Sequence, residues 1–200
     1  MTLDRFRSVA DRLLGPWVSA ADRLGLSPDQ VSVLAFGAAV LAAVAFAVAE
    51  PAFYVAGALL VLLNGWLDLV DGALAREQAV ASDGGDLLDH VLDRYADIAV
   101  IAGFTAGIDA YALGFLAVTG VLMTSYLGTQ IQAVGIGREY GGLLGRADRL
   151  ALMGIVGVVA AVYSDPLVAE YGAVALLLAL FAVIGHLTAL QRFLGAWRDL

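Results

Sequence analysis

Four aspartates at regular spacing are the residues of this chain most suited to chemistry. Asp68 and Asp71 lie three residues apart, and Asp89 and Asp93 lie four residues apart further along the chain. Both pairs interrupt segments that are otherwise apolar enough to cross a lipid bilayer. Carboxylates at such a depth are costly and are usually functional. The spacing therefore predicts a site in which several carboxylates act together.

Helical geometry places the members of each pair on one face. At 100° per residue, the first two aspartates project within about 60° of each other and share their face with Gly72 and Ala75. The second pair shares its face with Gly85 and Asp86. If the two faces pack together, the repulsion between carboxylates requires cations nearby. Oxygen ligands favour a hard divalent ion such as Mg²⁺, and the sequence has no cluster of His or Cys suited to zinc.

Other polar groups in these segments have ordinary explanations. Asp83 and Asp97 are interpreted as helix-capping or proton-relay groups. Asp86 is interpreted as a group that contacts the metal-binding residues and not the metal itself. His90 and His186 are isolated, and neither is assigned a catalytic role.

Composition indicates a protein that crosses a membrane several times. The chain has 200 residues, of which 61% are hydrophobic, and its mean hydropathy is +0.86. We expect an all-α polytopic membrane protein, in which residues 25–200 form one catalytic domain with six transmembrane helices. Residues 150–164 are short for a span, and residues 86–108 qualify only if their carboxylates are buried in protein. The six predicted spans are 31–49, 51–67, 86–108, 110–137, 150–164 and 171–191.

Residues 1–24 are expected to form an amphipathic helix on the membrane surface. Arg5, Arg7, Arg12 and Arg23 alternate there with apolar positions, a pattern typical of interfacial helices. The alternative is a solvated capping helix. No cleavable signal peptide is visible.

The positive charges predict the orientation in the membrane. All eleven are arginines, and they fall in the N-terminal segment, around two connections and near the C-terminus, whereas the other three connections have none. This segregation predicts that both termini and the aspartate motif are cytoplasmic, in a multi-pass protein of the cell membrane. The net charge of −8 and the lack of a basic stripe argue against nucleic-acid binding. The chain has no cysteine, which excludes disulfide and thiol chemistry.

Local signals predict where helices begin and end. Ser27 and Pro28 suit the start of the first span, since serine can cap a helix and proline fits its first turn. Gly84 and Gly85 are expected to break the helix between the two halves of the aspartate motif.

The complete pattern D-x2-D-G-x2-A-R-x8-G-x3-D-x3-D runs from Asp68 to Asp93. It resembles the signature of the CDP-alcohol phosphotransferase family at all eight defining positions. The segment from Gly25 to Ser32 also resembles the start of that family's first span, and six spans are what the family has.

The resemblance implies a specific reaction. A CDP-linked lipid would bind with its diphosphate bridged by two divalent metal ions, Mg²⁺ or Mn²⁺, and an alcohol would displace CMP. It also implies a homodimer. By motif position the metal ligands would be Asp68, Asp71 and Asp89 together with Asp93, which would also be the general base. The contacts to the cytidine diphosphate would be Gly72, Ala75, Arg76 and Gly85, with Ser32 at the same pocket.

The acceptor alcohol is less constrained. Residues 141–150 resemble the segment before the fifth span in family members that use inositol phosphate, so Arg146 and Arg149 are candidates for binding an acceptor phosphate. Simple anchoring by positive charge is the alternative. Residues 125–130 lack the basic residues that those relatives carry, and Arg138 is the candidate replacement. Glycerol phosphate is therefore a competing acceptor, and serine or unphosphorylated inositol stay open. The acidic, lysine-free composition suggests CDP-archaeol as the donor rather than CDP-diacylglycerol.

Two other functions are compatible with parts of the pattern. Asn64 and Asp68 match the N-x3-D element of intramembrane prenyltransferases, which also bind a diphosphate through Mg²⁺. An ion or proton transporter could use aspartates along its pathway, but it would spread them across the depth of the membrane.

Overall fold

The computed structural model describes residues 7–137 and 143–200, and this part of the chain is all-α, as predicted. It forms seven helices, joined by turns and short loops. In chain order they are α1 (Arg7–Arg23), α2 (Pro28–Val48), α3 (Pro51–Glu77), α4 (Asp83–Gly107), α5 (Tyr111–Ala133), α6 (Arg146–Val162) and α7 (Ala173–Asp199).

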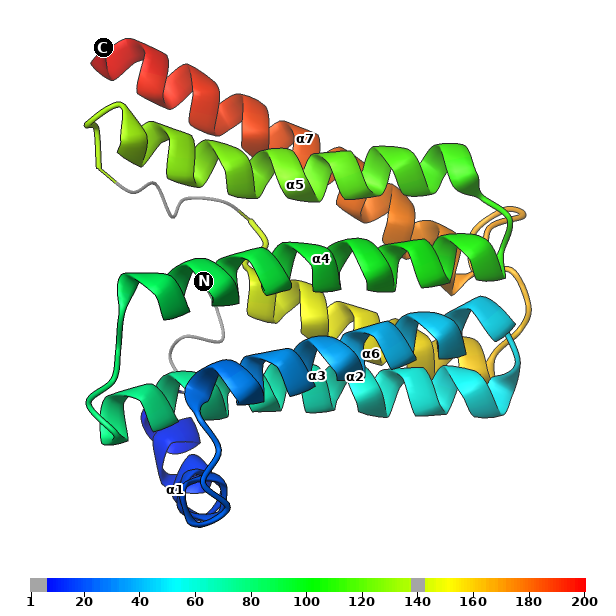
Figure 1. The fold of residues 1–200 in the computed structure, drawn as a ribbon. Helices are drawn as coiled ribbons and strands as arrows, with labels where there is room; N and C mark the ends of the chain where they lie inside the picture. Colours follow the sequence, from blue (N-terminus) through cyan, green and yellow to red (C-terminus); the bar gives the residue numbers. More distant parts are fainter. Residues whose placement is uncertain (1–6, 138–142) are drawn as a thin grey trace.

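The six helices α2 to α7 form a bundle in which consecutive helices run in opposite directions (Figure 1). One end of the bundle holds the starts of α2, α4 and α6 and the ends of α3, α5 and α7; we call it the motif end. Helix α1 lies across the motif end, next to α3. Helix α2 packs against both α3 and α4, α6 packs against α3, and α5 pairs with α7. The two halves of the aspartate motif therefore come from neighbouring parts of the bundle.

Length and composition allow four of the described helices to cross a membrane, namely α2, α3, α5 and α7. Helix α6 has 17 residues and is about 25 Å long, which is slightly less than the roughly 30 Å of a bilayer's hydrocarbon core. Helix α4 is long enough but carries five aspartates and an arginine. The structure thus supports four of the six predicted spans, and the other two stay predictions.

Helix boundaries follow the local chemistry of the chain. Ser27 caps α2: its hydroxyl accepts from the backbone N–H of Gln30, and the Gln30 side chain accepts from the backbone N–H of Ser27. Pro28 occupies the first turn, as expected. The predicted break at Gly84 and Gly85 is wrong, because both glycines lie in the first turn of α4. The break comes earlier, and the Ser82 hydroxyl caps α4 by accepting from the backbone N–H of Gly85.

Aromatic stacking and close backbone contact hold α2 and α4 together. The rings of Phe46 and Phe104 stack with centroids 3.8 Å apart, and both residues are fully buried. Gly103 lies so close to the backbone of Ala43 that any side chain there would collide with it. This contact fixes α4 against α2 and, through the rigid helix, fixes the aspartates at the motif end of α4.

Large apolar side chains cover the outside of the bundle. Leu59, Phe115 and Val183 are 62%, 66% and 57% exposed, and they lie on three of the helices that can span a membrane. Exposed apolar surface of this extent marks contact with something other than water. A lipid environment accounts for it, in agreement with the predicted membrane protein.

Helix α1 packs one face against the bundle. Leu14 and Val18 are buried among Val70 and Leu74 of α3. Trp17 is 56% exposed, and its ring meets that of Trp66 of α3 edge to face. This face of α1 is therefore used for packing, and a location at the membrane surface stays a prediction.

The contact between α2 and α4 yields a stability prediction. We expect Gly103→Ala to lower the midpoint of thermal unfolding in detergent by several degrees, because overpacking typically costs about 1–3 kcal/mol. Gly37→Ala is the matched control on α2, since a methyl group there meets nothing within 4 Å and alanine favours the helix by up to about 1 kcal/mol. Equal stability of Gly103→Ala and the wild type would contradict the close contact.

Candidate active site

Three of the four motif aspartates converge at the motif end. Asp68 of α3 and Asp89 and Asp93 of α4 each offer a carboxylate oxygen, and these three oxygens lie within 4.8 Å of one another. All three side chains are partly buried. Helix α3 continues to Glu77 without a break, so it carries the first half of the motif directly beside the second half.

The fourth aspartate, Asp71, is not one of the three whose oxygens lie within 4.8 Å of one another. Asp71 is 6% exposed, and its carboxylate accepts a hydrogen bond of 2.6 Å from the Ser32 hydroxyl. The same hydroxyl lies 3.2 Å from the backbone carbonyl of Pro28. The bond to Ser32 ties α2 to α3 and fixes the direction in which the Asp71 carboxylate points.

All five residues predicted to contact the cytidine diphosphate line a single cavity. This first cavity has a volume of about 480 Å³ and lies between the starts of α2 and α4 and the end of α3. Asp71 and Asp89 also line it, so it opens onto the carboxylates. Its lining includes Ser32, Gly72, Ala75, Arg76 and Gly85 from the predicted set, and Asp29, Gln78, Ser82 and Asp86, which sequence reasoning did not assign to it.

The two motif glycines leave this cavity open. A Cβ at Gly72 would come no closer than 3.6 Å to the Arg76 guanidinium, and a Cβ at Gly85 would lie 3.4 Å from a carboxylate oxygen of Asp29. Both are ordinary contacts, so packing alone does not demand glycine at either position. Room for a ligand close to the backbone is the remaining reason for glycine.

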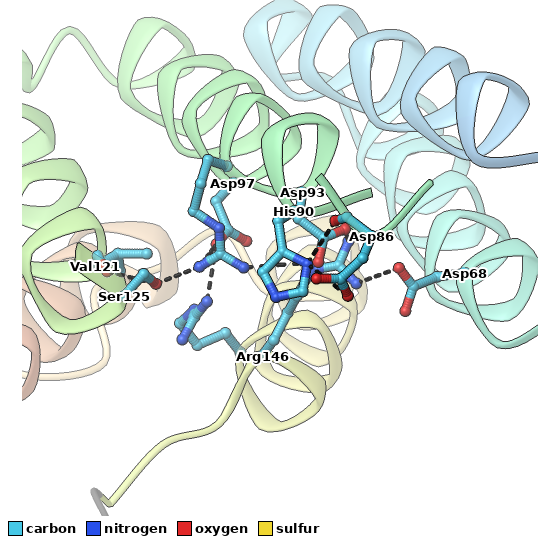
Figure 2. A network of polar contacts seen from close by, with 10 residues as sticks. Asp68, Asp86, His90, Asp93, Asp97, Val121, Ser125 and Arg146 are labelled. Carbon is cyan, nitrogen blue, oxygen red and sulfur yellow. Dashed lines mark hydrogen bonds and ion pairs between the residues drawn. The ribbon is translucent and has the colours of Figure 1, made fainter. Parts of the chain in front are cut away.

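Arg146, the first residue of α6, binds the carboxylate trio directly. Its Nη1 lies 2.7 Å from Asp68 Oδ1, and its Nη2 lies 2.6 Å from Asp93 Oδ1. Figure 2 shows this guanidinium reaching between the two carboxylates. The side chain was predicted to bind an acceptor phosphate, and in this structure its partners are two of the predicted metal ligands.

Arg149, one turn further along α6, has a different carboxylate partner. Its Nη2 donates to Asp97 Oδ2 at 2.8 Å, and both side chains are almost completely buried. Arg94 reaches the same region: it lies 3.7 Å from Asp97 and 3.6 Å from Asp93, and it contacts the Ser125 hydroxyl. The network links α4, α5 and α6. Arg138, the third predicted contact to an acceptor phosphate, lies outside the described residues.

Asn64 also lies beside the carboxylates, and the sequence analysis did not include it in their site. Its amide nitrogen donates to the backbone carbonyl of Ala35 at 2.9 Å, whereas its Oδ1 is buried without a hydrogen-bond partner. The residue lines a small cavity of about 10 Å³ together with all four motif aspartates, which is about the smallest space that holds one water molecule. A polar residue one helical turn before Asp68 is the signal that could have revealed it.

A second cavity lies on the other side of α4. It has a volume of about 580 Å³ and is bounded by α4, α5 and the last part of α7. Arg94 and Arg192 give it positive charge, and sequence reasoning used both only for topology. Its polar lining includes His90, Arg94, Ser125, Tyr126, Thr129 and Arg192.

Helix α4 separates the two cavities and contributes to both. Asp89 faces the first cavity, and its neighbour His90 lines the second. Successive residues on a helix point about 100° apart, so one helix can present different chemistry to the two sides. Asp93 lines the small cavity beside the carboxylates and contacts Arg94 of the second cavity.

The donor atoms fit a divalent cation. The trio and Asn64 supply only oxygens, and the unpartnered Asn64 Oδ1 lines the same small cavity as the carboxylates. Hard ions such as Mg²⁺ and Mn²⁺ bind oxygen ligands of this kind, and Mg²⁺ completes its shell with water and phosphate oxygens. An oxygen-lined cation site beside an open polar cavity is typical of enzymes that transfer phosphoryl-type groups.

Residues 25–187 match the CDP-alcohol phosphatidyltransferase family. The match covers most of the chain, and the chain belongs to this family. It is therefore a transferase of phospholipid synthesis.

Two relatives extend over most of the sequence. The archaetidylinositol phosphate synthase of Methanothermobacter thermautotrophicus is 31% identical over 99% of this chain and 95% of its own length. The phosphatidylinositol phosphate synthase of Mycolicibacterium smegmatis is 34% identical over 74% of this chain and 68% of its own length.

Solved structures of the Mycobacterium tuberculosis phosphatidylinositol phosphate synthase share the fold. The structure with CDP-DAG bound has a TM-score of 0.78 and 28% identity, and it covers 93% of this chain and 94% of the other. The complex with manganese and citrate also has a TM-score of 0.78, with 27% identity, and covers 92% of this chain and 88% of the other.

The first cavity yields a binding prediction. We expect Gly85→Leu to raise the KM for a CDP-linked lipid by roughly tenfold or more, because the side chain fills space that glycine leaves for the ligand. The matched control is Gly84→Leu, since Gly84 is exposed and does not line the cavity. Steady-state CMP release measures the KM, and a thermal unfolding midpoint within a few degrees of wild type shows that the variants fold. Equal KM values for both variants would argue against ligand binding in this cavity.

Proposed function

We propose that this enzyme transfers the lipid phosphate group of a CDP-linked lipid to inositol phosphate and releases CMP. The observation that carries the proposal is the joint position of the two cavities on either side of the carboxylates. The first would hold the donor and the second would hold the acceptor. Asp93 shares the small cavity with Asp89 of the first cavity and contacts Arg94 of the second.

Donor binding in the first cavity is supported by its lining. The Arg76 guanidinium can form paired hydrogen bonds with phosphate oxygens, and the glycines leave room beside the backbone. The trio of aspartates with Asp71 would hold two divalent ions, Mg²⁺ or Mn²⁺, next to the diphosphate. When bound, such ions neutralise charge on the diphosphate and orient the nucleophile and the leaving group.

The reaction needs one proton acceptor at the acceptor hydroxyl. The hydroxyl oxygen forms a bond to the phosphorus that carries the lipid, and the bond from that phosphorus to the bridging oxygen breaks. CMP leaves with the bridging oxygen, and Asp93 takes the hydroxyl proton as general base. Asp93 lines the small cavity that it shares with Asp89 and lies 3.6 Å from Arg94 of the second cavity, which suits it for this role.

A phosphorylated acceptor is supported by the charge of the second cavity. Arg94 and Arg192 line it. Arg94 also contacts Ser125, which lies in the segment 125–130 that has no basic residue of its own. The relatives named above are inositol phosphate synthases, which favours inositol phosphate over glycerol phosphate. Both CDP-archaeol and CDP-diacylglycerol suit the donor role.

The proposed location is a membrane with the motif end in the cytoplasm. Helices α4 and α6 would then complete six spans, with α1 at the interface and both termini on the cytoplasmic side. The segregation of arginine supports this orientation, because the described arginines gather at the motif end and the loops at the opposite end have none. A homodimer is part of the proposal on family resemblance alone.

The reaction is tested by mass spectrometry of lipid products from purified protein. CDP-archaeol and CDP-diacylglycerol are each incubated with Mg²⁺ and one of inositol 1-phosphate, glycerol 1-phosphate, glycerol 3-phosphate, serine or inositol, and CMP release is followed in parallel. We expect a Mg²⁺-dependent product with inositol 1-phosphate. The Asp93→Asn variant should still bind the CDP-linked lipid and release CMP at least about 100-fold more slowly, as loss of a general base implies.

Each other outcome has a definite meaning. A product with glycerol phosphate or with an unphosphorylated alcohol instead would keep the transferase and overturn the choice of acceptor. Equal loss of donor binding and turnover in Asp93→Asn would argue against a base and for a structural role.

The orientation is tested with single cysteines, since the chain has none of its own. Ser164→Cys lies in the loop between α6 and α7, and Glu77→Cys lies at the motif end of α3; both positions are exposed. In intact cells we expect a membrane-impermeant maleimide to label Ser164→Cys and to reach Glu77→Cys only after permeabilisation. The reverse pattern would place the motif end outside the cytoplasm.

A further inference from the structure

We propose that Arg146 is a built-in counter-ion of Asp68 and Asp93, which divalent cations must displace in order to bind these two carboxylates. The inference rests on the metal-binding role that the proposed function gives to these aspartates. It assigns Arg146 a role on the carboxylates themselves, before any acceptor arrives.

The geometry of the contact is that of a strong, two-armed ion pair. The two terminal nitrogens of one guanidinium lie 2.7 and 2.6 Å from oxygens of carboxylates on different helices. The arginine side chain is only 16% exposed, and that of Asp93 only 14%. Charge-assisted hydrogen bonds at such distances are among the stronger ones in proteins. The contact also joins α6 to both α3 and α4.

The same contact conflicts with a metal ion. Asp68 and Asp93 are two of the three residues whose oxygens converge closely enough to share an ion. The guanidinium lies between their Oδ1 atoms, and Arg94 faces Asp93 Oδ2 from 3.6 Å. A divalent cation bound by both carboxylates would therefore lie within a few ångströms of a like charge. Repulsion at such a distance is strong in a partly buried site.

The position of Arg146 on α6 favours its release. As the first residue of the helix, it lies at the positive end of the helix dipole, where a cation is unfavourable. The ion pairs offset this cost only while the two carboxylates are available. The neighbouring capping group does not depend on them, because the Gly145 N–H donates to the Asp148 carboxylate at 3.0 Å. Arg146 can therefore leave while the start of α6 stays capped.

Displacement would give the site an order of assembly. Asp68 and Asp93 would first hold the metal ions, and the guanidinium of Arg146, released from them, would then be available to an anion such as an acceptor phosphate. Arg149 does not change partner in this scheme, since Asp97 is outside the trio.

The test measures Mn²⁺ affinity by electron paramagnetic resonance in detergent, with no donor and no acceptor present. We expect Arg146→Gln to tighten Mn²⁺ binding on the order of tenfold, within the usual range of coupling between linked events. Arg146→Lys, which keeps the charge but cannot bridge two carboxylates, should give a smaller change. Arg198→Gln, an exposed arginine near the end of α7, controls for loss of one positive charge. Arg94→Gln controls for a charge near Asp93.

A second readout separates displacement from a general charge effect. In EDTA the thermal unfolding midpoint of Arg146→Gln should fall below that of wild type, and saturating Mn²⁺ should narrow the gap, since ligand affinity and stability are linked. Unchanged or weaker Mn²⁺ binding in Arg146→Gln would overturn the proposal, as would equal tightening in Arg94→Gln. If Arg146→Gln does not fold, unchanged or weaker binding in Arg146→Lys overturns it in the same way. Because no substrate is present, failure here is distinct from failure of the transferase assay.

Discussion

Repulsion among carboxylates at one end of an apolar bundle is the constraint that the rest of this structure obeys. Asp68, Asp89 and Asp93 lie close enough to share an ion, and a low-dielectric surrounding makes such proximity costly. Two arginines in the first turn of α6 offset this repulsion. Arg146 pairs with Asp68 and Asp93, and Arg149 pairs with Asp97. The placement of α6 against α3 is thus an electrostatic requirement as well as a packing result.

The apolar part of the bundle keeps this arrangement in register. Close contact at Gly103 fixes α4 against α2, and the bond from Ser32 to Asp71 fixes α2 against α3 at the motif end. Helices are stiff over such lengths, so packing in the middle of the bundle sets the positions of side chains at its end. The three helices that line the first cavity, α2, α3 and α4, are therefore fixed against one another at the motif end.

Much of the site could be predicted because its information is local. The spacing from Asp68 to Asp93 determines which side chains share a helix face, and the five residues expected at the nucleotide all line one cavity. The break between α3 and α4 was misplaced because Ser82, a capping residue, ends the loop before the glycines do. The partners of Arg146 and Arg149 depend on how α6 packs against distant helices, and no short-range pattern encodes that.

The two cavities share α4 but differ in their other walls. The first is built from α2, α3 and the loop before α4, whereas the second is built from α5 and the end of α7. Substitutions on α5 or α7 can reshape the second cavity while the carboxylates and the first cavity keep their surroundings. Under the proposed function, a duplicated gene can thus diverge toward a new acceptor alcohol through changes in two helices, while the cavity proposed for the nucleotide is inherited unchanged.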